Sequence, residues 1–431
     1  PWCKYAHAVE DARRIPFYVE QAIRTSFYGR PGAVYLDMSD DIILQKVEEG
    51  QALPAATIPD APRPQAMHDD VEAALAALES AERPLVIVGK GMAWSHAENE
   101  VREFIERTQL PFLASPMGKG VVPDDHPLSV GAARTTALQD ADLVFLMGAR
   151  LNWIMHFGLP PRFDKDVRVI QLDNAAEEIH ANVPAEVALV GDGKAVVGQL
   201  NKALEDRQWF YPADTDWRNV LAEKASANAE AVQPMIDDES APTNYYRAFK
   251  DIRDWLSEDA IVVSEGANTM DIGRTQMPNS LPRSRLDAGS YGTMGIGMGF
   301  AIAAAVVHPE RPVVAVEGDS GFGFSGMEVE TMCRYKLPVK IVILNNGGIG
   351  GGMDELPNDA PIPPSILTPR ARYDLMMEAF GGKGILIEDP KDLRGALDEA
   401  MAFDGPAIVN VILDPRAGRK PQKFEWLTKD D

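Results

Sequence analysis

The sequence predicts an α/β protein of several domains, in which doubly wound parallel sheets form the cores. The chain has 431 residues, which is too many for one ordinary domain. Short unbroken runs of Val, Ile and Leu alternate with amphipathic segments, as in PLVIVGKG, ADLVFLMGAR and LPVKIVILNN. Strands of this composition lie in parallel sheets that helices cover on both faces. An apolar content of 45% is sufficient for a full core.

The first 65 residues read as the end of a domain followed by a linker. An amphipathic helix is expected over 16–29, and RPGAVYLDM reads as the strand that follows it. We therefore expect residues 1–45 to be the C-terminal remnant of an α/β domain. Residues 46–65 contain Pro, Ala and acidic residues without periodicity, which is typical of a linker.

Two stretches show a complete alternation of helices and strands. The first covers 66–205 and begins with a helix expected over 69–81, so we predict a central α/β domain there. Residues 206–242 are acidic and rich in Ala, and we expect a second linker with some helix. The alternation then resumes, with helices near 373–380 and 391–402, which predicts a second α/β domain with a C-terminal tail over 243–431.

The net charge and the cysteines restrict the partners and the compartment. A net charge of −23 argues against a nucleic-acid surface, which needs a basic stripe, and against an anionic membrane face. No apolar run approaches the roughly 20 residues that span a bilayer. Two distant cysteines, Cys3 and Cys333, form neither a disulfide framework nor a zinc site. We therefore expect a cytoplasmic protein.

Polar residues end two neighbouring strands in the stretch VEGDSGFGFSGMEVETMCRYKLPVKIVILNNGG. Asp319 follows VVAVE, and Asn346 follows VKIVIL, with the helix SGMEVETMCRYK between them. In such a strand–helix–strand unit both residues lie at the carboxyl edge of the sheet, where α/β proteins bind ligands. Mg²⁺ prefers oxygen ligands and commonly completes its shell with phosphate oxygens. Each motif alone is a common turn, but together they predict a metal–diphosphate site formed by Asp319, Asn346 and the Gly348 carbonyl.

This pairing of GDS with NN resembles the fingerprint of thiamine-diphosphate enzymes, in which GDG is followed by NN at about this spacing. The resemblance covers the whole chain and implies the thiamine-diphosphate-dependent decarboxylase type of fold. It assigns 1–45 to the end of a pyrimidine-binding domain, 66–205 to a central domain and 243–431 to a diphosphate-binding domain. In that family the cofactor lies between two subunits, so the resemblance implies a homodimer or homotetramer.

A narrower resemblance links the chain to the 2-hydroxyacyl-CoA lyase and oxalyl-CoA decarboxylase family. It is carried by GARLNW, SEGANTMDIGR, VEGDSGFGFSGMEVET, YDLMMEAFGGKG and the tail AGRKPQKFEWLT. The resemblance implies a lyase that uses thiamine diphosphate and Mg²⁺ to cleave a 2-hydroxyacyl-CoA into formyl-CoA and an aldehyde or ketone. The reverse reaction is an acyloin condensation. The alternatives are an oxalyl-CoA decarboxylase and, in another class, a non-catalytic cofactor-binding fragment.

The resemblance also implies residues that hold the cofactor. Met294 is expected to lie between the thiazolium and aminopyrimidine rings, and the Gly292 carbonyl to accept a hydrogen bond from the 4′-amino group. The other reading of Met294 is a core methionine. ADP is a further ligand that the resemblance allows in the central domain. The remaining expected cofactor contacts are Gly266, Ala267, Asn268, Gly318, Ser320, Gly321, Asn346, Gly348 and Ile349.

Substrate contacts and catalysis are expected from a second group of residues. Arg274, with Arg150, Asn152 and Arg419, is expected to bind coenzyme A, and ion pairs are the other reading of the arginines. Glu355, predicted to be catalytic together with Met294, is expected to act as an acid or base; its other reading is a solvated carboxylate. The tail over 415–431 is expected to close over coenzyme A or to be a disordered terminus.

One functional group of the family has no counterpart in this chain. The resemblance implies a Glu that binds N1′ of the aminopyrimidine, in the half of the pyrimidine-binding domain that would precede Pro1. A molecule that started at Pro1 would therefore be expected to bind the cofactor unproductively and not to turn over.

Overall fold

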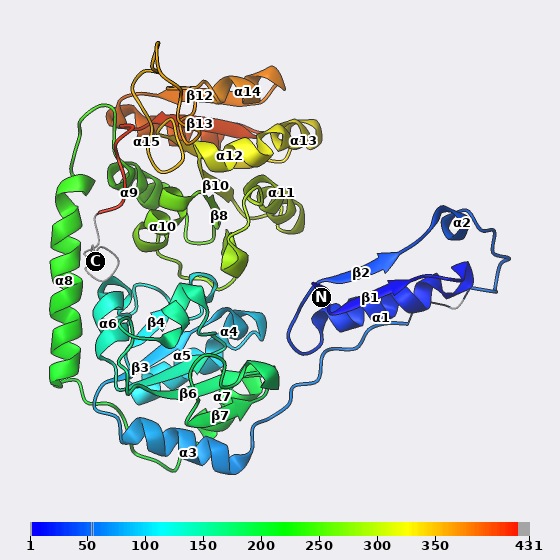
Figure 1. The fold of residues 1–431 in the computed structure, drawn as a ribbon, viewed down its shortest axis with the longest axis vertical. Coiled ribbons are helices and arrows are strands. Elements are labelled where there is room, and N and C mark those ends of the chain that lie inside the picture. Colours follow the sequence, from blue (N-terminus) through cyan, green and yellow to red (C-terminus); the bar gives the residue numbers. More distant parts are fainter. Residues whose placement is uncertain (1, 53, 55, 421–431) are drawn as a thin grey trace.

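Three parallel sheets organise the chain (Figure 1). The computed structural model describes residues 2–52, 54 and 56–420. From the N-terminus to the C-terminus, the three sheets have two, five and six strands, and every strand pairing within them is parallel. The predicted α/β class with parallel sheets is therefore confirmed.

A small N-terminal unit stands apart from the two larger sheets in Figure 1. Its strands pair from Tyr5 opposite Val34 to Ala8 opposite Asp37, and its helix packs on them through Tyr18. The helix expected over 16–29 is thus present, while its Phe27 side chain remains exposed. The elements are β1 (Tyr5–Ala8), α1 (Ile15–Phe27), β2 (Val34–Asp37) and α2 (Asp40–Ile43).

The central sheet has the strand order β4-β3-β5-β6-β7. Strands β3 and β5 are buried along their whole length, because helices cover both faces of the sheet. The predicted helix over 69–81 corresponds to α3. The elements are α3 (His68–Glu79), β3 (Pro84–Val88), α4 (Lys90–Trp94), α5 (Glu98–Thr108), β4 (Phe112–Ala114), α6 (Arg134–Asp140), β5 (Leu143–Met147), β6 (Arg168–Asp173), β7 (Val187–Val190) and α7 (Gly193–Ala203).

A long helix, α8 (Asp216–Ile236), connects the central sheet to the C-terminal sheet along one side of the molecule (Figure 1). It begins where the Thr215 side chain accepts a hydrogen bond from the Arg218 amide. Trp217 and Leu221 pack on the core of the central sheet, and Ile236 packs on the core of the C-terminal sheet. The helix therefore bridges two cores.

The C-terminal sheet has the order β12-β13-β11-β10-β8-β9, with one hydrophobic core on each face. The helix expected over 325–336 is a 3₁₀ turn at Gly326–Glu328 followed by α13, and a further helix, α12, precedes it. The elements are α9 (Tyr245–Trp255), β8 (Ile261–Glu265), α10 (Ala267–Gln276), β9 (Arg285–Asp287), α11 (Gly297–Val307), β10 (Val313–Gly318), α12 (Asp319–Ser325), α13 (Val329–Tyr335), β11 (Lys340–Asn345), α14 (Asp374–Ala379), β12 (Lys383–Ile387), α15 (Pro390–Ala402) and β13 (Ala407–Ile412).

Candidate cofactor site

Asp319 and Asn346 lie at the carboxyl ends of adjacent strands. Strands β10 and β11 pair in parallel with Gly318 opposite Leu344, so the residues that follow them meet at one edge of the sheet. Asp319 is 1% exposed. One of its oxygens accepts a hydrogen bond from the Ser320 amide at 2.7 Å, and the other accepts from the amides of Gly347 and Gly348 at 2.7 and 3.1 Å. We call Asp319, Asn346, Gly347 and Gly348 the strand-end cluster.

The charge of Asp319 makes this cluster suitable for a cation. Burial raises the pKa of Asp319 to about 6, although its three amide hydrogen bonds act in the opposite direction. An ionised carboxylate that burial disfavours is stabilised by a cation. Among the described residues, no group of three or more His, Cys, Asp and Glu side chains could hold a metal ion. A metal here would therefore depend on one carboxylate, one amide, backbone carbonyls and ligand oxygens, a donor set that fits Mg²⁺.

The glycine loop after β11 brings backbone close to this carboxylate. A Cβ on Gly348 would lie 2.2 Å from the Gly351 carbonyl oxygen, and a Cβ on Gly352 would lie 1.9 Å from the Asn346 backbone carbonyl oxygen. The Ile349 amide donates to the Ser365 carbonyl at 2.8 Å, although the Ile349 side chain is exposed. Only glycine permits this close folding, which holds the Gly348 amide beside Asp319. The role of the Gly348 carbonyl stays a prediction.

The predicted diphosphate contacts gather at the ends of β8 and β10. Gly266 has φ +104° and precedes α10, and a Cβ there would lie 3.2 Å from the Gly318 amide nitrogen. Ala267 is exposed at the start of α10, where free amides favour anions. The Asn268 side chain donates to the Gly350 carbonyl at 2.8 Å. Residues that the structure brings together here are Gly266, Ala267, Asn268, Gly318, Ser320 and Gly321.

Gly292 and Met294 belong to residues 289–297, which run from a 3₁₀ turn at Gly289–Tyr291 to the first residue of α11 and which we call the Met294 loop. Gly292 and Gly295 have φ values of +61° and +86°, conformations that glycine adopts readily. Met294 is 38% exposed and lies outside the buried core, so the reading of this side chain as a core methionine is wrong. The loop therefore presents Met294 for a contact beyond its own core.

Two buried carboxylates that sequence reasoning missed lie behind the Met294 loop. Glu265 and Glu317 are register partners on β8 and β10, and both are fully buried. Glu265 accepts hydrogen bonds from the amides of Gly295 and Gly297, the second at 2.6 Å. Glu317 has no hydrogen-bond partner among the described residues, and burial together with the Glu265 charge raises its pKa well above the usual range. The available signal was an acidic residue before glycine at the end of an apolar run, in SEG and VEG.

Arg150 and Asn152 contact the start of the Met294 loop. Both side chains approach the Ser290 hydroxyl, at 3.5 and 3.3 Å, and the Trp153 indole N–H donates to the Ser290 carbonyl at 2.6 Å. Arg150 also lies 3.6 Å from the Glu178 carboxylate. This segment follows β5 of the central sheet, so it joins the two large sheets at the loop that carries Met294.

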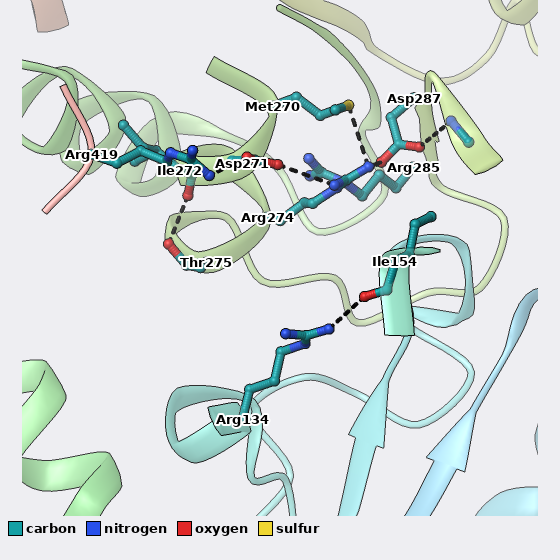
Figure 2. Close-up of polar contacts among 11 residues, drawn as sticks. Arg134, Ile154, Met270, Asp271, Ile272, Arg274, Thr275, Arg285, Asp287 and Arg419 are labelled. Carbon is teal, nitrogen blue, oxygen red and sulfur yellow. Dashed lines mark hydrogen bonds and ion pairs between the residues drawn. The ribbon is translucent and has the colours of Figure 1, made fainter. Parts of the chain in front are cut away.

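Arg274 and Arg419 take part in a row of alternating charges, which Figure 2 shows around Asp271 and Asp287. Two guanidinium nitrogens of Arg274 lie 3.1 Å from one Asp287 oxygen, and a third lies 3.2 Å from Asp271. Arg419 pairs with the other oxygen of Asp271. The buried Arg285 lies 3.7 Å from Asp287. Ion pairs, which were the other interpretation of Arg274 and Arg419, are therefore present in this structure.

Arg134 is a further cation near this row that sequence reasoning missed (Figure 2). It donates to the Ile154 carbonyl at 2.8 Å, and it makes no ion pair within the described chain. Burial, with the positive charges of Arg162 and Arg274, lowers its pKa to about 10. Its charge is therefore less compensated than that of Arg274, and an anion beside it would be stabilised. A lone Arg in GAARTTALQD gave no signal.

Glu355 and the tail stand outside these contacts. Glu355 is exposed in the loop after Gly352, and no hydrogen bond or ion pair of the described residues links it to the strand-end cluster. The part of the expected tail over 421–431 lies outside the described residues. The proposed roles of both remain predictions.

Two family models match separate parts of the chain. Residues 71–200 match the thiamine pyrophosphate enzyme central domain, and residues 266–411 match the thiamine pyrophosphate enzyme C-terminal TPP binding domain. The second match includes the strand-end cluster and the Met294 loop.

Relatives of known name align along almost the whole chain. Human 2-hydroxyacyl-CoA lyase 1 is 45% identical over 444 residues, which cover 100% of this chain and 77% of the human protein. The 2-hydroxyacyl-CoA lyase of Arabidopsis thaliana is 42% identical, over 98% of this chain and 76% of that protein. Oxalyl-CoA decarboxylase of Escherichia coli K12 is 43% identical, over 97% of this chain and 74% of that protein.

Proposed function

On the premise that the chain belongs to the thiamine pyrophosphate enzyme family, in the group of 2-hydroxyacyl-CoA lyases and oxalyl-CoA decarboxylases, we propose that it is a carbon–carbon lyase. The reaction is cleavage of a 2-hydroxyacyl-CoA to formyl-CoA and an aldehyde or ketone, or the reverse condensation. The observation that carries this proposal is the strand-end cluster of Asp319 and Asn346, in a chain 45% identical to a lyase along its whole length.

The cofactor would be held by residues that already converge in the fold. Asp319, Asn346 and the Gly348 carbonyl would bind Mg²⁺, and amides near Gly266 and Ser320 would bind the diphosphate. When bound, thiamine diphosphate supplies the electron sink that cleavage next to a carbonyl requires. The remaining predicted contacts, from Gly292, Met294 and Ile349, would orient its rings.

The acyl-CoA would use the cations between the two large sheets. Arg134 has the least compensated charge there, so it is the first candidate for a phosphate of coenzyme A, with Arg274 and Arg419 beside it. Arg150 and Asn152 contact Ser290 instead, which favours a supporting role. Glu355 remains our proposed acid or base.

Oxalyl-CoA decarboxylase is the second candidate, because a decarboxylase relative is 43% identical over 97% of the chain. The test is to supply thiamine diphosphate and Mg²⁺, and then a 2-hydroxyacyl-CoA or oxalyl-CoA in separate reactions. A lyase gives formyl-CoA with an aldehyde or ketone from the first substrate. A decarboxylase gives formyl-CoA with CO₂ from the second alone. Absence of formyl-CoA from both would contradict the enzyme proposal, and cofactor binding without turnover would support the non-catalytic alternative.

An association of the chain with itself is proposed from an exposed apolar surface. Helices α11, α12 and α13, with the turn between the last two, lie next to one another on one side of the C-terminal sheet (Figure 1). A surface of this kind on a folded protein is commonly an interface. We define the α11–α13 patch by its most exposed members, which are Val306, Val307, Phe324, Met327 and Tyr335.

ADP binding is proposed at the carboxyl edge of the central sheet. Lys90 follows β3 there, and burial together with the charges of Arg150 and Arg30 lowers its pKa. Arg30 and Arg150 both approach Glu178. Three cations at a sheet edge support an anionic ligand, and calorimetric titration with ADP would test it.

A cytoplasmic location remains our proposal, and it is supported by Cys3 and Cys333, which are free thiols. Among the described helices, none combines the length and apolar character needed to cross a bilayer.

A further inference from the structure

We propose that Glu265 is a positioning residue that holds the Met294 loop in place against the sheet and couples this loop to the turn after Asp319. The proposal concerns a side chain that would not itself touch the cofactor. It rests on the proposed function only for the role of the Met294 loop in cofactor binding. The contacts of Glu265 themselves are properties of the fold.

The two oxygens of Glu265 have separate partners in the Met294 loop. One oxygen accepts from the amide of Gly295, the residue directly after Met294, and the other accepts from the Gly297 amide at 2.6 Å. Gly297 is the first residue of α11, and the residue before it, Ile296, provides no side-chain cap. Glu265 therefore acts as the missing cap of α11 from a neighbouring strand, where the helix dipole also favours a negative charge.

The opposite end of the loop is also fixed by a carboxylate. The Asp287 side chain accepts from the Gly289 amide at 3.0 Å, just before the loop reaches Ser290. Gly292 lies between these two attachments, and Gly295 lies at the second one. Both have positive φ, and glycine gives the backbone little rigidity of its own. The position of Met294 is therefore set by its attachments, and the attachment nearest to it is Glu265.

The same side chain lies against the turn that would bind the diphosphate. A Cβ on Gly321 would approach the Glu265 Cγ to 3.3 Å, so the turn after Asp319 packs directly on it. On the other side, a Cβ on Gly297 would lie 2.2 Å from the Glu317 oxygen, so the start of α11 fits closely over both carboxylates. Glu265 thus contacts the loop predicted to separate the cofactor rings and the turn predicted to hold the cofactor diphosphate.

The direct test is amide hydrogen exchange in the protein without cofactor, comparing the wild type with Glu265→Gln. Gln preserves the volume but presents an N–H₂ group to one of the two amides, so one hydrogen bond is lost. We expect the Gly295 and Gly297 amides to exchange about 10- to 100-fold faster, as for the loss of a hydrogen bond to a charged group. Glu265→Asp, which withdraws the carboxylate by one methylene group, serves as the second variant if the Gln variant does not fold.

A matched control is available in the central sheet. Asp142 also uses its two oxygens to accept two backbone amides, those of Glu82 and Arg83, both at 2.8 Å. Asp142→Asn should increase exchange at those amides and leave the Met294 loop unchanged. The same pair of variants is then titrated with thiamine diphosphate and Mg²⁺: the Glu265 variant should bind about 10-fold more weakly and show a lower kcat at saturating cofactor, whereas the control should do neither.

Each outcome has a distinct meaning. Unchanged exchange at Gly295 and Gly297 in the Glu265 variants would overturn the proposal, and so would a faster-exchanging loop with unchanged cofactor affinity and kcat. A wild-type protein that binds no cofactor and yields no product, but whose loop still loosens in Glu265→Gln, would contradict the proposed function and support the attachment.

Discussion

At the scale of single residues, the site depends on carboxylates buried at strand ends. Asp319 is surrounded by amides of Ser320, Gly347 and Gly348, and burial raises its pKa to about 6. Such a group is costly to keep ionised without a cation. The energetic cost of burying it is therefore consistent with a functional role, since an apolar residue would pack the same space more stably.

Replacement of Asp319 by Asn is expected to weaken Mg²⁺ binding by at least about 100-fold, because even outer-shell changes at metal sites cost 10- to 100-fold. Asn346→Asp retains an oxygen donor and should change the affinity by less than about tenfold. The measurement is the Mg²⁺ concentration that half-saturates thiamine diphosphate binding, followed by tryptophan fluorescence. Equal affinities for the wild type and Asp319→Asn would remove Asp319 from the metal site.

His156 makes the stability depend on pH. Burial, with the charges of Arg134 and Arg162, lowers its pKa to about 4, below the value near 6.5 of an unfolded chain. Between these values the unfolded chain binds the proton and the folded chain does not, so the contribution of His156 to stability rises with pH from about 4 to 6.5 and is constant above. Because His156 is only partly buried, solvent screening reduces this contribution. His156→Asn, which suits the local φ of +49°, should therefore reduce the stability difference between pH 5 and 7.5 by about 1 kcal/mol or less in urea unfolding.

The control for this effect is His68→Asn, a substitution at an exposed position at the start of α3. Its pH dependence should match that of the wild type. If His156→Asn retained the full difference between pH 5 and pH 7.5, another group would have to account for the slope.

At the scale of elements, the segment after β5 of the central sheet supports the Met294 loop of the C-terminal sheet. Asn152 and Trp153 both donate to Ser290, and Asp287 and Glu265 hold the two ends of the same loop. The loop is therefore attached to the ends of β8 and β9 and to the segment that follows β5. Because loops with glycine at positive φ have little rigidity of their own, these attachments determine where Met294 lies.

Asn152→Ala is expected to raise the dissociation constant of thiamine diphosphate about two- to tenfold, as for the loss of one hydrogen bond, and to leave the KM for the acyl-CoA unchanged. Asn201→Ala is the control, since Asn201 is a buried residue of helix α7 and donates to the Glu100 carbonyl at 2.9 Å. A higher KM for the acyl-CoA with unchanged cofactor affinity would instead return Asn152 to the substrate site.

At the scale of the whole molecule, the sequence patterns were sufficient for the parallel-sheet architecture and for the placement of Asp319 and Asn346 at one edge of a sheet. Continuous apolar runs predicted the strands of both large sheets, because buried parallel strands tolerate little else. The positions of Asp319 and Asn346 followed from the strand–helix–strand unit. The partners of Glu265 and of Arg274 could not be predicted, because these contacts join segments whose separation in sequence carries no periodic signal. The charge of a residue gives no indication of which distant group will neutralise it.

The α11–α13 patch is the feature of the whole molecule that a single chain leaves unexplained. Val307 is 67% exposed, and two other members of the patch, Phe324 and Met327, are 66% and 64% exposed. If a second copy covers this side, the interface should approach the 1,600 Å² or so that is usual for stable complexes. Sedimentation velocity of the wild type should then show a species of at least twice 47.1 kDa.

Val307→Lys should shift that species toward the monomer, because a charged side chain buried in an apolar interface costs several kcal/mol to desolvate. Val190→Lys, at a 40% exposed position at the end of β7, is the matched control and should leave the assembly intact. A wild type that sediments as a monomer at every concentration would contradict the self-association. If instead both variants remained assembled, the α11–α13 patch would lie outside the interface. In either case the Met294 loop, whose Tyr291 side chain is 88% exposed, would then need a different covering group to exclude water from the cofactor.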